Sequence, residues 1–178
     1  ARFERIVELV ESANPELKAV CTLPPPTTKP AEASQKARDL AKRAGIWAPP
    51  ASRMIPEDLR GYGEAGGDAW LYPDRTPYAG SLSLLASPLD VRSLAWQAYR
   101  LGCSGILCPT VNDWGDGGRP TAAGSASCLI WPGREFGLDH PVPSIRLKRL
   151  LRAAQDYEYL WLLERNRRPG VARRLARD

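Results

Sequence analysis

Short apolar segments alternate with amphipathic segments along this chain, and this alternation is the strongest constraint on its fold. A first helix is predicted at the start, where Phe3, Ile6, Val7 and Val10 form one apolar stripe at helical spacing. Strands are expected over residues 17–23, 46–48, 68–72 and 104–111, and helices over 30–44, 56–62, 87–101 and from 144 onward. Such strict alternation predicts a parallel sheet with crossover helices.

Four parallel strands are half of an eight-stranded (β/α)8 TIM barrel. The 178 residues suffice for one domain but fall short of the roughly 250 of a complete barrel. We therefore expect an α/β fold in which residues 1–164 form a partial barrel and residues 165–178 a separate basic tail. On pattern alone, a small doubly wound sheet fits as well.

The first residue and the hydropathy of the sequence bear on the origin of the chain and on its association with membranes. Residue 1 is alanine and the only methionine is Met54, so we expect a processed product, an excised domain or a fragment. No apolar run approaches the ~18 residues of a membrane span, and no secretory signal is present. We therefore expect no membrane partner.

Charge is concentrated at the C-terminus. The net charge is +5, and residues 165–178 hold six arginines against one aspartate. A basic tail can bind nucleic acid or an anionic polymer or surface, and a solvated, disordered terminus is the alternative. No nucleic-acid-binding motif accompanies it, so we expect no nucleic-acid partner.

The cysteine pattern argues against a metal centre. The four cysteines form no CxxC pair, and His140 is the single histidine. Three of them, Cys21, Cys103 and Cys108, lie in or beside apolar runs, where a free thiol acts as a small hydrophobic group. We expect neither a metal nor a cofactor.

Ligands of parallel α/β folds bind beyond the carboxyl ends of the strands. This rule selects the loops at 24–28, 48–53, 72–78 and 112–118. Tyr72 lies at a strand exit, where its hydroxyl can reach a ligand. The alternative is that Tyr72 and Trp70, which point to the same face, are both core residues.

The second chemically distinctive loop begins at Asn112. An apolar strand there ends in Asn112, Asp113 and Trp114, an amide, a carboxylate and an indole. Indole faces pack on sugar rings, while amides and carboxylates bind their hydroxyls, so we expect a carbohydrate substrate. A simple turn is the alternative. Asp113 and Asp116 share one loop, whereas glycosidase carboxylates flank the scissile bond from different strands, so the catalytic residues stay unknown.

Two groups of segments together resemble the C-terminal region of family 123 glycoside hydrolases or of uncharacterised relatives of that family. The first group comprises residues 90–99, 105–107 and 111–114, and the second residues 131–133, 141–147 and 156–160. The resemblance implies that the chain is the C-terminal half of the barrel. It also implies an extracellular or periplasmic location and a sugar subsite that contains Tyr72 and Trp114.

The resemblance further implies a substrate-assisted, retaining hydrolysis of glycans that end in N-acetyl-β-galactosamine. The acetamido oxygen of the sugar attacks the anomeric carbon, and an adjacent Asp-Glu pair orients it and protonates the leaving oxygen. No Asp-Glu dipeptide occurs in this chain, and the pair would lie before Ala1. The relatives' Gly-Asp-Gly is replaced by Gly-Ser-Ala-Ser at 124–127. We therefore expect the chain alone to be inactive.

The last helix carries an expected structural pair. Arg146 near its start and Glu158 further along are interpreted as ion-pairing or capping partners that fix the helix on the barrel. Its buried face is expected to consist of Leu147, Leu150, Leu151, Ala154, Tyr157 and Trp161.

Three functions stay open at this point. The first is a truncated glycoside hydrolase, the second a non-catalytic carbohydrate-binding domain, and the third an anionic-polymer binder that uses the arginine-rich tail. A half barrel would also leave two open sheet edges, which predicts self-association.

Overall fold

The computed structural model describes residues 2–23, 35, 39, 42–84, 86–112 and 128–177. Its contacts divide the chain into two compact units. The first comprises residues 1–72 and 101–107, and the second residues 73–100 and 108–178. The basic segment after residue 164 therefore belongs to the second unit.

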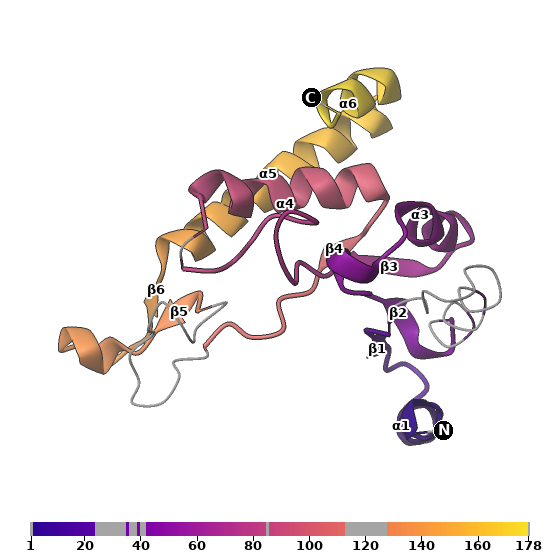
Figure 1. Ribbon diagram of the computed structural model, residues 1–178, viewed down its shortest axis with the longest axis horizontal. Helices are drawn as coiled ribbons and strands as arrows, with labels where there is room; N and C mark the ends of the chain where they lie inside the picture. Colours follow the sequence, from indigo (N-terminus) through magenta and orange to yellow (C-terminus); the bar gives the residue numbers. More distant parts are fainter. Residues whose placement is uncertain are drawn as a thin grey trace. The chain divides into compact units, whose positions relative to one another are not determined.

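The first unit is built on a four-stranded parallel sheet (Figure 1). Its elements are α1 (Arg2–Ala13), β1 (Ala19–Cys21), β2 (Gly45–Trp47), η1 (Ala51–Arg53), α3 (Pro56–Glu64), β3 (Asp68–Leu71) and β4 (Gly105–Ile106). The strands follow the order β1-β2-β3-β4, and each neighbouring pair is parallel. The predicted α/β class, with four parallel strands alternating with helices, is confirmed.

The strand order distinguishes the two folds that the sequence left open. A doubly wound sheet reverses its strand order at a switch point, whereas barrel strands follow one another in sequence. The sheet runs from β1 to β4 without reversal. This order is consistent with about half of an eight-stranded barrel.

Trp47 is the centre of the core beneath the sheet. Its side chain is fully buried, and its ring meets that of Tyr62 on α3 edge-on, with centroids 5.4 Å apart. The indole Nε1 donates a hydrogen bond to the carbonyl of Leu23 at 3.1 Å. Trp47 lies in register with Cys21 and Ala69, which are buried on the same face. One aromatic residue thus joins α3, the sheet and the chain that leaves β1.

The structure shortens one predicted strand of the first unit and describes one predicted helix only in part. The strand predicted over 104–111 is only Gly105–Ile106, because Cys108 to Asn112 follow in irregular backbone. Of the helix predicted over 30–44, the described residues 35, 39 and 42–44 are helical, and the others lie outside the described residues. That helix ends at Gly45, whose φ of 95° is in the left-handed region that favours glycine.

The second unit is mainly helical. It contains α4 (Pro88–Leu101, except its last residue), β5 (Ile130–Trp131), η2 (Gly133–Phe136), β6 (Val142–Pro143), α5 (Ile145–Arg165) and α6 (Pro169–Leu175). Strands β5 and β6 form an antiparallel pair, which the sequence did not predict. Val91, Leu94, Ala95 and Ala98 form the buried face of α4.

The buried face of α5 is offset by one residue from the prediction. Arg146, Ala153 and Leu160 are its buried residues, whereas the predicted Leu151 is 62% exposed and Trp161 is also exposed. The prediction followed the apolar residues and placed the face one position too late, which rotates it by about 100°. The prediction missed this offset because Arg146 is a charged residue that lies at a buried position.

The C-terminal segment is helical. Residues 165–178, for which a separate basic tail was expected, contain the end of α5 and helix α6. Helix α6 packs against α5, and Ala172 is fully buried. The arginines of this segment therefore project from a folded helical pair.

Candidate functional site

Tyr72 directly follows β3 at the carboxyl end of the sheet. Its carbonyl accepts a hydrogen bond from the amide of Ala51 at 2.9 Å, and Tyr72 forms an isolated parallel bridge with Pro50. The ring is half-buried. The backbone of Tyr72 is thus held by the segment that follows β2, as a site residue at a strand exit requires.

Trp70 packs as a residue of the sheet. A Cβ added to Gly105 on β4 would come within 2.8 Å of the Trp70 indole, so the ring lies directly over that glycine. Trp70 and Gly105 are register partners. This packing supports the structural interpretation of Trp70.

Asn112 is exposed at the start of the loop to which Asp113 and Trp114 belong. Asp113 and Trp114 lie outside the described residues, so their roles stay predictions. The base of the loop is closed: the carbonyl of Val111 accepts hydrogen bonds from the amides of Leu129 at 2.8 Å and Ile130 at 3.0 Å. These two bonds fix the backbone directly before Asn112.

Arg146 ties the base of this loop to the loop that follows β3. Its side chain is only 6% exposed; Nη1 donates to the carbonyl of Leu82 at 2.8 Å, and Nη2 donates to the carbonyl of Cys128. Burial lowers the pKa of Arg146, an effect that nearby Cys128 opposes. Guanidinium is well suited to this position because one planar group presents several fixed donors.

The expected pairing of Arg146 with Glu158 is wrong. Glu158 is exposed, while Arg146 is buried against main-chain carbonyls. Twelve residues of α-helix separate the two side chains by about 18 Å along the axis and turn them by about 120°. The expected helix start is confirmed: the Ser144 hydroxyl accepts a hydrogen bond from the amide of Leu147 at 3.2 Å.

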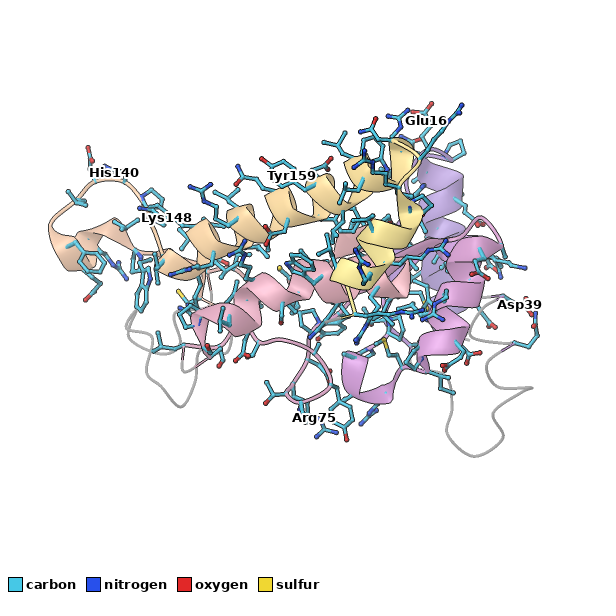
Figure 2. All side chains as sticks on the ribbon, turned by 90° about the horizontal axis from the view of Figure 1, so that it is seen from above. Glu16, Asp39, Arg75, His140, Lys148 and Tyr159 are labelled. Atoms are coloured by element: carbon cyan, nitrogen blue, oxygen red, sulfur yellow. The ribbon has the colours of Figure 1, made fainter. Side chains whose placement is uncertain are left out.

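The loop after β3 presents an exposed aromatic residue from a fixed base. The amide of Gly80 donates to Gln97 Oε1 on α4 at 3.1 Å, and a Cβ on Gly80 would collide with the carbonyl of Asp90. Tyr78 is exposed nearby, with the Arg75 guanidinium 5.7 Å from its ring centroid. Figure 2 shows Arg75 projecting outward at this loop. The sequence selected this loop but did not single out Arg75 and Tyr78. The signal that could have found Tyr78 was an aromatic residue in a Pro- and Gly-rich loop.

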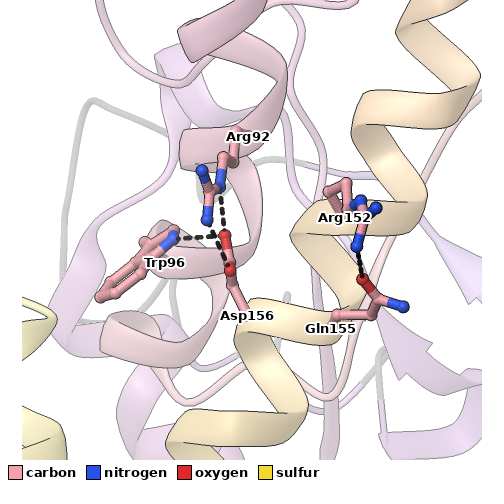
Figure 3. A network of polar contacts seen from close by, with 5 residues as sticks. All are labelled: Arg92, Trp96, Arg152, Gln155 and Asp156. Carbon is pink, nitrogen blue, oxygen red and sulfur yellow. Dashed lines mark hydrogen bonds and ion pairs between the residues drawn. The ribbon is translucent and has the colours of Figure 1, made fainter.

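Asp156 is unsuited to act as a general acid. Both of its oxygens accept hydrogen bonds from Arg92, and Trp96 donates its indole N–H at 3.1 Å (Figure 3). The hydrogen bonds from Arg92 hold the pKa of Asp156 below its ordinary value, although partial burial opposes the effect. This carboxylate stays ionised, and its role is to join α4 and α5.

The buried ionisable groups are also structural. Burial raises the pKa of Cys21, Cys108 and Tyr62, and raises that of Cys103 to about 12. A thiol in this state is a poor nucleophile at neutral pH. Within the described ranges, no three histidine, cysteine, aspartate or glutamate side chains gather as metal ligands would.

Tyr72 belongs to the first unit and Asn112 to the second. The second unit by itself brings together the base of the Asn112 loop and the base of the loop after β3, through Arg146. We call residues 73–84, 86–87, 108–112 and 128–131 with Arg146 the clamped loops. They follow β3 and β4, the strands whose ends the barrel rule selects.

The sequence matches no protein-family model, and no curated protein matches it. Among solved structures, the fold is similar to that of a family 123 glycoside hydrolase from Clostridium perfringens, analysed for the details of glycolipid glycan hydrolysis. The TM-score is 0.60 and the sequence identity 12%. The match covers 96% of this chain and 36% of the other, so this chain spans about a third of that protein's length. At this identity the likeness extends to the fold.

Proposed function

We propose that this chain is the glycan-binding part of a glycoside hydrolase-type barrel. The observation that carries the proposal is the buried Arg146, which fixes the bases of the two clamped loops at once. Binding sites gain affinity when their loops are ordered before the ligand arrives, because the entropy of ordering is then already lost. The likeness of the fold to a glycoside hydrolase supports the same ligand class.

In the second unit the proposed sugar contacts are Asn112, Asp113 and Trp114, and Tyr72 of the first unit is proposed as a separate candidate from its position at a strand exit. The indole would pack on the apolar face of the sugar ring, while the amide and the carboxylate would bind its hydroxyl or acetamido groups. The preferred ligand is a glycan that ends in N-acetyl-β-galactosamine, as the family resemblance implies.

Hydrolysis is proposed only for a protein that also supplies an Asp-Glu pair. In the substrate-assisted, retaining reaction, the acetamido oxygen attacks the anomeric carbon and a carboxyl group protonates the leaving oxygen. These 178 residues contain no Asp-Glu dipeptide. We therefore expect the chain alone to bind the glycan without cleaving it, so its own function is that of a carbohydrate-binding domain.

Isothermal titration of the chain with a glycan ending in N-acetyl-β-galactosamine tests the proposal. Saturable binding is expected, with affinity lowered by Trp114→Ala and by Asn112→Ala. Tyr159→Ala removes an exposed aromatic residue of α5 and serves as the matched control, which should bind like the unaltered chain. Absence of binding, or equal affinity in Trp114→Ala and Tyr159→Ala, would contradict the proposal.

An assay with a chromogenic N-acetyl-β-galactosaminide separates binding from catalysis. The chain alone should release no product at concentrations that saturate binding. Turnover that survives substitution of Asp113 and Asp116 together would show that a different group in this chain is catalytic.

A further inference from the structure

The end of α5 and helix α6 form an arginine-rich surface. Six arginines lie between residues 165 and 177, and no acidic residue lies among them: Arg165, Arg167, Arg168, Arg173, Arg174 and Arg177. All six are exposed. Because α6 packs against α5 and Ala172 is buried, these side chains are held on one small helical pair (Figure 1). Together with the apolar side chains described next, they are called the C-terminal basic surface.

Exposed apolar side chains accompany the arginines. Leu162 is 43% exposed, Leu175 46% and Trp161 39%. The guanidinium of Arg165 lies 4.5 Å from the centroid of the Trp161 ring. A partner that recognises charge alone would leave the two leucines in water, so the surface fits a partner that offers both negative charge and an apolar layer.

Arg167 occupies a backbone position that favours glycine. Its φ is 61°, and its amide and that of Arg168 donate to the carbonyls of Glu164 and Leu163. These two bonds are the Schellman ending of a helix, whose left-handed position is usually glycine. A side chain there costs stability. Because a side chain at this position is costly, we infer that the guanidinium of Arg167 has a function.

In the part of the chain that the structure describes, little of this charge is neutralised within the surface. Arg173 is 4.0 Å from Glu164, which also accepts a hydrogen bond from the Tyr99 hydroxyl at 3.2 Å. Pairs this exposed are weak. The surface thus keeps most of its positive charge for an external partner.

We propose that the C-terminal basic surface docks on an anionic lipid membrane. Arginines bind headgroup phosphates as bidentate donors, while tryptophan and leucine enter the boundary between headgroups and acyl chains. Each arginine near an anionic bilayer adds roughly fivefold to binding, and the apolar side chains anchor it. The proposal is independent of the glycan site.

This docking differs from insertion across a bilayer. In the part of the chain that the structure describes, no helix is long and apolar enough to cross a membrane. The sequence expectation of no membrane partner rested on the absence of a spanning segment and of a secretory signal. A surface that binds peripherally needs no such segment.

Vesicle co-sedimentation of the full chain tests the proposal. Vesicles of phosphatidylcholine with phosphatidylglycerol are expected to bind at least about a hundredfold more tightly than phosphatidylcholine alone. The triple variant Arg167→Gly, Arg168→Gln, Arg174→Gln should weaken binding about a hundredfold. Its Arg167→Gly change suits the local backbone, so unfolding is not expected to account for the loss. The variant Leu162→Ser, Leu175→Ser should weaken binding about tenfold.

The matched control removes the same charge from elsewhere. Arg60, Arg100 and Arg149 are exposed outside the surface, and their combined change to glutamine should leave binding within about twofold. An equal loss in this control would overturn the proposal in favour of overall charge. No binding to anionic vesicles would overturn it outright. Tight binding to heparin with an unaffected leucine variant would overturn it in favour of a soluble polyanion.

Discussion

Arg92 on α4 and Asp156 on α5 form a bidentate ion pair, with Nε to Oδ2 at 2.6 Å and Nη2 to Oδ1 at 2.9 Å. The Trp96 indole donates to the same carboxylate. Arg92 and Trp96 come from segment 90–99 and Asp156 from segment 156–160, two of the segments that carry the family resemblance. The resemblance therefore includes both sides of one helix–helix contact, which is a property of the fold rather than of the active site.

Asp156→Asn is expected to lower the free energy of unfolding by about 1 kcal/mol, because it removes the charge of a half-exposed pair and leaves weaker hydrogen bonds. Urea unfolding followed by tryptophan fluorescence measures the change. Arg152→Gln is the control, since Arg152 is exposed and donates a hydrogen bond to Gln155 one turn away on α5 (Figure 3). A comparable loss of unfolding free energy in both variants would show that the Arg92–Asp156 pair contributes no more to stability than an exposed side chain does.

The same pair predicts a pH dependence at the acid end. Because Arg92 depresses the pKa of Asp156 in the folded state, the stabilisation is fully present above the ordinary carboxyl pKa of ~3.9. It is lost as the pH falls through the lower folded value. The stability difference between the unaltered chain and Asp156→Asn should therefore be constant near pH 6 and shrink below about pH 4. A difference that grows on acidification would contradict this sign.

Arg146→Met is expected to lower the free energy of unfolding by about 2–4 kcal/mol, because two buried carbonyls lose their donor. Hydrogen exchange should also quicken at residues 128–131, where the loop base loses its clamp. Arg146→Lys should recover only part of the stability, since one ammonium lacks the planar fork. Exposed Lys148 provides the control: Lys148→Met should change stability by less than about 0.5 kcal/mol.

The helix and strand order could be predicted because its signals are local. Asn14 ends α1 before Pro15, Ser144 caps α5, and the apolar runs mark the strands. The rotation of α5 could not be predicted in the same way. Its buried face includes Arg146, and a buried cation can be recognised only when the carbonyls of Leu82 and Cys128, distant in sequence, are known.

The candidate site was predicted less completely than the fold. The strand-end rule selected Tyr72, which lies at the exit of β3, and Asn112, which lies in the chain after β4, and their roles in binding stay predictions. It could not select Arg75 and Tyr78, because their contact depends on how the loop folds on itself. The role of Arg146 was misassigned because helical spacing says nothing about main-chain acceptors in other segments.

Arg167→Gly is expected to raise the free energy of unfolding by about 0.5–1 kcal/mol, because it relieves a left-handed backbone without removing a buried contact. Thermal unfolding of the two proteins measures the gain. Arg168→Gly is the matched control: its φ of −119° is ordinary for any residue, so glycine there should be neutral or destabilising. Equal gains in both variants would attribute the effect to reduced charge repulsion.

Cys103 should be unreactive in the folded protein. Burial raises its pKa to about 12, so at pH 8.5 the folded chain holds a protonated, inaccessible thiol. Iodoacetamide should label it only at the rate of unfolding, as mass spectrometry of the peptide would show.

The stability linked to the Cys103 thiol is fully present below the ordinary thiol pKa near ~8.5 and is lost as the pH rises toward about 12, because only the unfolded thiol ionises in that interval. Rapid labelling of the native chain at pH 8.5 would contradict this burial.

The chain is expected to self-associate through its sheet. Among the described strands, β1 and β4 are the outer ones, and outer strands present unpaired backbone groups that can pair with another chain. The weight-average mass from light scattering should therefore rise with concentration. Thr22→Lys adds a charge directly after β1 and should lower the mass, whereas Ser12→Lys on exposed α1 should not. A monomer at every concentration would show that these edges are protected. Association that survives Thr22→Lys but is lost in Leu162→Ser, Leu175→Ser would locate it instead on the C-terminal basic surface.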